Sequence, residues 1–402
     1  MIIKLDMVQT AAIGVIVLFI GQVIKNKADF LEKYCIPSPV IGGLLFAIMT
    51  LILRQTGILT LEMDATLQKL FMTVFFTTIG FTASFRLLKK GGIQVFIFLA
   101  ISVTLVILQN TTGVFLAKIF NLNPLIGLST ASVPMVGGHG TAGAFGPVFE
   151  KAGAVGATTV AIASATFGLI MGSMIGGPIA KRLIEKNNLL EKKKRFAELD
   201  SKEIAITEEV NVKELVPNNF MNATAQIFLA MGIGTIISNL LQKTGMTFPP
   251  YIGAMFAAAI LRNISDSTNI FKIYGEEIDI LGNISLSLFL AMALMALQLW
   301  QLADLALPLV IMLSAQTVLM ALFAYFVTFN LMGRDYEAAV IASANCGFGM
   351  GATPNAMANM EAIVSKFGPA PKAFFIVPLV GSLFIDFFNA GTITIFMNFF
   401  AK

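Results

Sequence analysis

Asp386 is the residue whose type and surroundings first suggest chemistry. It lies in the apolar stretch PLVGSLFIDFFNAG (378–391), where it is the only carboxylate inside a predicted membrane span. Burying an ionisable group in a bilayer is costly, so such a residue predicts a functional site. Its carboxylate could bind sodium, pair with a substrate ammonium group or exchange a proton, and Asn389 shares its helix face. A structural hydrogen bond to nearby backbone is the alternative.

Two glycine-rich stretches interrupt apolar runs, VPMVGGHGTAGAFG at 133–146 and NCGFGMGATPN at 345–355. Each glycine in a helix interior costs about 1 kcal/mol, so both stretches predict a broken helix. Half-helices that meet at a break leave N–H and C=O groups without partners. The N–H groups attract anions and the carbonyls coordinate sodium. Close helix packing is the alternative role for these glycines.

Polar side chains accompany both breaks. They are Ser132 and Thr141 at the first break, and Asn345, Thr353 and Asn355 at the second. Oxygen ligands of this kind suit a small, hard cation. His139, the only histidine of the chain, could carry a proton, contact a substrate or cap a half-helix as a neutral group.

Composition places the chain in a membrane. Of its 402 residues, 56% are hydrophobic and 12% are charged, whereas a soluble domain carries about 25% charged residues. The small net charge of +4 bears on topology and gives no reason to expect nucleic acid. Cys35 and Cys346 lie far apart in the sequence and on segments predicted at the cytoplasmic side, where disulfides are rare, so we expect no structural disulfide. One histidine and two cysteines are too few for a zinc cluster.

Ten long apolar segments predict membrane-spanning helices. They are roughly 8–24, 38–53, 67–85, 93–117, 156–180, 223–242, 250–262, 279–300, 305–332 and 373–400. The first is expected to be retained rather than cleaved as a signal peptide, because Asp6 interrupts its basic start. The glycine-rich segments 124–149 and 338–361 predict re-entrant hairpins. The polar groups of their backbone must find partners in the surrounding protein or in a water-filled cavity.

Basic residues predict the orientation. With both termini outside, most of the 27 basic residues fall on the inner side, many of them in a charged linker at 184–222. Counting either hairpin as a full span would spoil this bias. We therefore expect a multi-pass protein with a cytoplasmic linker.

An internal repeat relates the two halves. An offset of 211 residues carries Pro39 to Pro250, Gly138 to Gly349 and Gly140 to Gly351. Residues 1–183 and 223–402 each hold five spans and one hairpin, and an odd number of spans inverts the second half. The predicted fold is therefore an all-α membrane protein of two inverted repeats, each with five transmembrane helices and one re-entrant hairpin. Such repeats indicate a secondary transporter with a site near the midplane.

Three motifs make the chain resemble the bacterial sodium/glutamate symporter family. They are GGHGT at 137–141, GFGMGATPNAMANMEAIVSKFGPAPKAF at 347–374 and IVPLVGSLFIDFFNA at 376–390. The resemblance implies an inner-membrane homodimer that takes up L-glutamate with sodium and needs no organic cofactor. It also implies an elevator mechanism, in which a hairpin-bearing core slides past a dimerising scaffold.

The resemblance also selects candidate site residues. The substrate candidates are Gly138, His139, Gly140, Thr141, Gly349, Gly351, Ala352, Thr353, Asn355 and Asp386. The candidates for sodium are Ser132, Asn345, Asp386 and Asn389. Backbone N–H groups at the breaks are expected to hold the carboxylates of glutamate.

Energetics predict at least two sodium ions per glutamate. A thousandfold glutamate gradient costs about 4.1 kcal/mol, and moving its negative charge against 100 mV adds roughly 2.3 kcal/mol. Each sodium ion returns about 3.7 kcal/mol from a tenfold gradient and the same potential. One ion is therefore insufficient, whereas two return about 7.4 kcal/mol against about 6.4 kcal/mol.

Other functions remain open at this point. A sodium- or proton-coupled carrier of citrate or of another dicarboxylate would fit the same pattern. An enzyme is disfavoured, because the single histidine and the buried aspartate lie on different segments without a catalytic motif.

Overall fold

The computed structural model describes residues 2–29, 31, 36–90, 92–190, 217–243, 249–300 and 305–400. These residues are almost wholly helical, which confirms the all-α membrane class. Within them, two short strands, β1 (Ile2–Leu5) and β2 (Thr60–Met63), form a parallel pair. The sequence did not predict this pair, because each strand has four residues and its partner lies far along the chain.

The helices follow the predicted apolar segments. In the first half they are α1 (Met7–Lys25), α3 (Ser38–Gln55), α4 (Thr66–Thr82), α5 (Phe85–Lys90), α6 (Gly92–Ile119), α7 (Pro124–Leu128), α8 (Ser132–Met135), α9 (Gly138–Lys151) and α10 (Ala157–Lys186). In the second half they are α12 (Pro217–Gln242), α13 (Pro250–Thr268), α14 (Gly275–Met295), α15 (Ala306–Phe323), the π-helix η2 (Ala324–Thr328), α16 (Phe329–Leu331), α17 (Tyr336–Met350), α18 (Thr353–Phe367), α19 (Pro371–Leu383) and α20 (Ile385–Phe400).

Seven of the described helices are long and apolar enough to cross a membrane, and α19 with α20, bent by 43°, is an eighth candidate if the pair counts as one span. Two of the ten predicted spans fall outside this group. Helix α4 has only 17 residues, whereas a straight span needs about 20. Helix α13 also falls outside the group, and its last turns carry the charged residues Arg262 and Asp266, which make that part of the helix polar.

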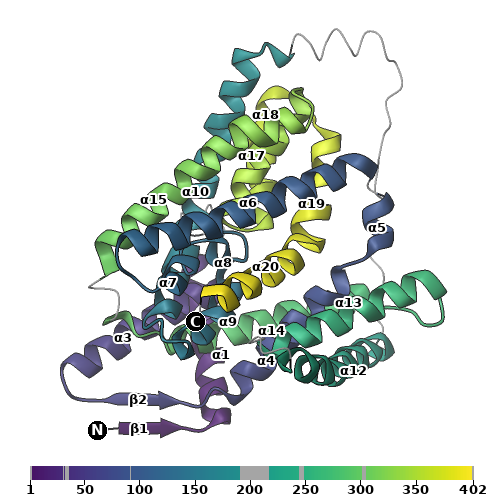
Figure 1. The fold of residues 1–402 in the computed structure, drawn as a ribbon. Coiled ribbons are helices and arrows are strands. Elements are labelled where there is room, and N and C mark those ends of the chain that lie inside the picture. The colour runs from purple at the N-terminus through teal and green to yellow at the C-terminus, as the bar shows by residue number, and fades with distance from the viewer. Residues whose placement is uncertain are drawn as a thin grey trace.

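The helices form two bundles (Figure 1). The first bundle comprises α1, α3, α4, α12, α13 and α14, at the bottom of the view. The second bundle comprises α6 to α10 and α15 to α20, above it. Each bundle therefore draws on both halves of the chain, and α5 leads from the first bundle into the second.

The glycine-rich segment 124–149 differs from the prediction of two half-helices. It holds three short helices, α7, α8 and α9. The additional break occurs before Ser132, whose backbone N–H and Oγ both donate to Oδ1 of Asn110 on α6, at 3.2 and 2.8 Å. A side chain of another helix thus accepts from the backbone N–H that would have continued α7. In the segment 338–361, α17 and α18 meet at a single break around Gly351.

Glycine residues on α10 allow the second break to pack closely against this helix. A side chain at Gly168 would overlap the backbone oxygen of Met350, and one at Gly172 would lie 2.8 Å from that of Cys346. Glycine at these positions lets the end of α17 rest directly on the α10 backbone.

Two predictions concern residues that are described only in part. Residues 191–216, which make up most of the predicted linker 184–222, lie outside the described residues. Cys346 is a buried free thiol, and Cys35 also lies outside the described residues.

Candidate functional site

A cavity of about 350 Å³ lies between the two bundles, within the size range of small-molecule sites. The second bundle contributes both glycine breaks, part of α10 and the bend between α19 and α20. The first bundle contributes Phe75 on α4, Pro37 just before α3, and Asn283, Leu286 and Leu290 on α14.

The first break places the N-terminus of α9 at this cavity. Gly138 begins α9 with a φ of +58°, where residues other than glycine are strained. Gly138, His139 and Gly140 all line the cavity. His139 is buried, and its Nε2 lies 3.0 Å from Oγ1 of Thr166 on α10. This hydrogen bond fixes the imidazole ring at the cavity wall.

The second break places the N-terminus of α18 at the same cavity. Gly351, Ala352 and Thr353 form this part of the wall. Oγ1 of Thr353 donates a hydrogen bond of 3.0 Å to the carbonyl of Gly381 on α19. The bond ties the break to the helix that leads to Asp386.

Two helix N-termini thus face one small volume. The start of a helix carries partial positive charge and free N–H groups, which together bind anions. Asp386, in the first turn of α20, places a carboxylate in the same wall. The arrangement can hold a small molecule with both signs of charge, its carboxylates at the helix starts and its ammonium group at Asp386.

Thr141, Gly349 and Asn355 lie behind the wall rather than in it. Nδ2 of Asn355 donates to the carbonyl of Leu169 on α10 at 2.8 Å. The carbonyl of Gly349 accepts a hydrogen bond of 2.7 Å from Nε2 of Gln109 on α6. These contacts anchor the second break to α10 and α6.

The predicted sodium ligands form separate groups. Nδ2 of Asn389 donates to the carbonyl of Ser132 at 3.1 Å, and Oγ of Ser132 donates to Asn110. Asn345 belongs elsewhere, because its Nδ2 donates to Oγ1 of Thr328, in the π-helix, at 2.7 Å. The structure thus brings Ser132 and Asn389 together, and leaves Asp386 in the cavity wall.

Two of these side chains have an oxygen suited to a cation. Oδ1 of Asn345 and Oδ1 of Asn389 are buried and accept no hydrogen bond within the described part of the chain. Leaving a buried acceptor unsatisfied costs about 1–3 kcal/mol. A sodium ion at each oxygen would remove that cost, so both residues fit the predicted cation.

Sequence reasoning missed the partners of these residues. Gln109 and Asn110 on α6 and Thr328 in the π-helix are buried polar residues that hold the breaks or the sodium candidates in place. The signal was available for α6, because two adjacent amides interrupt the apolar run 93–117. A buried polar pair in a span marks a functional region.

Comparison with known proteins assigns the chain to a family. The family model described as Sodium/glutamate symporter matches residues 3–369. The chain is 40% identical to the sodium/glutamate symporter of Escherichia coli (strain K12) over 396 residues, which cover 98% of both chains. It is 38% identical to that of Haemophilus influenzae over 388 residues, 96% of both chains. These relatives are named as transporters and not as enzymes, and this chain belongs to the sodium/glutamate symporter family.

Proposed function

We propose that this protein takes up L-glutamate with sodium across the inner membrane. The observation that carries the proposal is the cavity between the bundles, where the N-termini of α9 and α18 and the carboxylate of Asp386 meet. The names of the relatives supply the substrate and the ion.

Glutamate matches the charges of the cavity wall. Its two carboxylates require two sites for negative charge, and the helix starts at Gly138 and Ala352 provide them. Its ammonium group requires an acceptor, and Asp386 provides a charged one. His139 also lines this cavity.

At least two sodium ions accompany each glutamate in this proposal. Asn389 with Ser132 forms one candidate site and Asn345 forms another, and each contains a buried side-chain oxygen without a partner in the described chain. Asp386 is a third candidate, in contact with the cavity itself. Two or more ions also satisfy the energy requirement of concentrating an anion.

Transport proceeds by an elevator movement in this proposal. Nearly all the polar groups of the cavity belong to the second bundle, whereas the first bundle contributes a mainly apolar wall at Phe75, Leu286 and Leu290. A substrate held by the second bundle can move with that bundle along the mainly apolar wall of the first bundle. The same order of elements in both halves supports two inverted repeats with re-entrant hairpins, and the first bundle would form the homodimer contact.

Uptake of labelled glutamate into proteoliposomes tests the function. Replacing external sodium with potassium or choline should abolish accumulation, and an inside-negative potential should stimulate it, because two sodium ions and one glutamate carry net positive charge. Accumulation without sodium would refute the coupling, and electroneutral uptake would refute the stoichiometry. Stronger competition by citrate or aspartate than by unlabelled glutamate would assign another substrate.

A further inference from the structure

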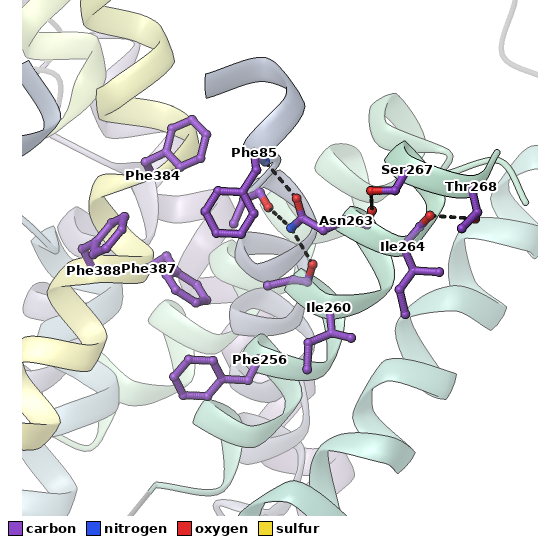
Figure 2. A pocket seen from close by; sticks show the side chains of 12 residues that line it. Phe85, Phe256, Ile260, Asn263, Ile264, Ser267, Thr268, Phe384, Phe387 and Phe388 are labelled. Carbon is purple, nitrogen blue, oxygen red and sulfur yellow. Dashed lines mark hydrogen bonds between the residues drawn. The ribbon is translucent and has the colours of Figure 1, made fainter. Parts of the chain in front are cut away.

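A second cavity, of about 470 Å³, lies on the other face of the bend between α19 and α20 (Figure 2). Its wall includes Phe85 of α5, Phe256 and Ile260 of α13, and Phe384, Phe387 and Phe388 at the bend. The same bend presents Ile385 and Asp386 to the first cavity. This second cavity therefore also lies where the two bundles face each other.

The polar side chains of this wall are engaged with the protein. Nδ2 of Asn263 donates to the carbonyl of Ala83 at 2.7 Å, and its Oδ1 accepts from the backbone N–H of Phe85 at 2.9 Å. The hydroxyl groups of Ser267 and Thr268 each donate to a carbonyl of their own helix at 2.7 Å, as Figure 2 shows. The remaining surface is aromatic and aliphatic, so the cavity favours an apolar occupant.

The dimensions of the cavity match one lipid leaflet. Along α13 it extends from Phe256 to Thr268, which is about 18 Å at 1.5 Å per residue. Half of the hydrocarbon core of a bilayer is about 15 Å. Phe256 stacks edge-on with Phe387 of the second bundle, with ring centroids 5.3 Å apart. This aromatic pair lies at one end of the stretch of α13 that lines the cavity, and Ser267 and Thr268 lie at the other end.

Basic side chains follow directly after the cavity wall on α5. Arg86 and Lys89 are exposed on α5, within four residues of Phe85 in the cavity wall. Basic side chains at the membrane surface attract anionic lipid headgroups.

We propose that this cavity binds one acyl chain of an anionic phospholipid, whose phosphate lies at Arg86 and Lys89. The apolar wall, its length of about one leaflet and the basic side chains of α5 together select this occupant. The lipid would lie between the bundles and support the bend that carries Asp386. This site is distinct from the transport site and does not depend on which solute is carried.

Fluorescence quenching by brominated lipid tests the proposal. Trp300 is the only tryptophan of the chain and is not part of the cavity wall. A Trp300→Phe protein therefore has no tryptophan fluorescence of its own. Phe256→Trp then reports from the cavity. Val318→Trp, at an exposed position on α15 of the second bundle, reports from ordinary surrounding lipid. The protein is reconstituted in phosphatidylcholine with a small fraction of phosphatidylglycerol, and either lipid is brominated in its acyl chains.

Brominated phosphatidylglycerol should quench Phe256→Trp more than its mole fraction predicts, and Val318→Trp only in proportion to it. The preference should fall about fivefold for each charge lost in Arg86→Gln and Lys89→Gln. Lys181→Gln with Arg182→Gln, which removes the same charges from exposed positions on α10, should leave it intact. Proportional quenching at both reporters, or no quenching at Phe256→Trp, would overturn the proposal. The readout requires no transport, so it stands apart from the test of glutamate uptake.

Discussion

Gly138 and Gly351 lie next to each other in the wall of the cavity between the bundles. A Cβ atom on Gly138 would lie 3.4 Å from the backbone oxygen of Gly351, so the two broken helices approach each other directly. The contact is between bare backbones, and it lies in the wall of the cavity between the bundles. The start of α9 and the start of α18 are therefore fixed relative to each other.

Gly138→Ala should destabilise this arrangement. The φ of +58° at Gly138 costs an alanine roughly 1–2 kcal/mol. We expect a lower melting temperature in detergent and weaker glutamate uptake. Gly177→Ala on α10 is the control, because a Cβ there meets open space and the backbone is unstrained. Equal stability and equal uptake in the two variants would contradict the strained break.

The spans and the breaks were largely predictable from the sequence. The apolar run 93–117 became Gly92–Ile119, and the glycine stretches 133–146 and 345–355 contain the starts of α9 and α18. Hydropathy and glycine content are local signals, so a single sequence contains them. The end of α4 was not predictable, because Asn263, remote in the sequence, bonds Ala83 and Phe85 and holds the chain in a turn.

The part of the cavity wall that the first bundle contributes could not be predicted from the sequence. Phe75, Leu286 and Leu290 are ordinary apolar residues of predicted spans, and only the packing of the two bundles makes them line a cavity. Asp386 was identifiable because a charge in an apolar run is rare. Thr141, Gly349 and Asn355 lie behind the wall because of the face that each half-helix turns to the cavity. Residues around the breaks are mostly buried on every face, so the sequence there has no polar and apolar sides that would indicate this face.

Asp386→Asn should weaken glutamate binding. The substitution keeps the size of the side chain and removes the charge that we propose faces the ammonium group of glutamate. Hydrogen bonds to charged groups contribute about 1.5–3 kcal/mol, so the KM for glutamate should rise at least about tenfold. Glu361→Gln, at an exposed position on α18, is the matched control and should leave KM unchanged. If KM and sodium dependence are both unaffected in Asp386→Asn, the residue has no part in the site.

Asn345→Ala should change the sodium dependence of uptake. If Asn345 binds one of two sodium ions, its loss lowers the Hill coefficient for sodium from about two towards one. Asn359→Ala removes another buried amide, whose Nδ2 bonds the carbonyls of Gly172 and Ser343. This control should lower stability and leave the Hill coefficient intact. A lower maximal rate with unchanged sodium dependence in Asn345→Ala would assign that residue a structural role only.

A disulfide between the bundles should stop transport. An ideal Cβ on Gly143 of α9 lies 3.8 Å from Cβ of Ala293 on α14, which matches the mean Cβ separation in disulfides. In a Cys35→Ser, Cys346→Ser background, Gly143→Cys with Ala293→Cys should cross-link on mild oxidation. Uptake should then fall to background and return on reduction, whereas each single cysteine variant should be insensitive to oxidant. Full uptake by the cross-linked protein would show that the second bundle does not slide past the first, because the bond holds α9 against α14 throughout the cycle.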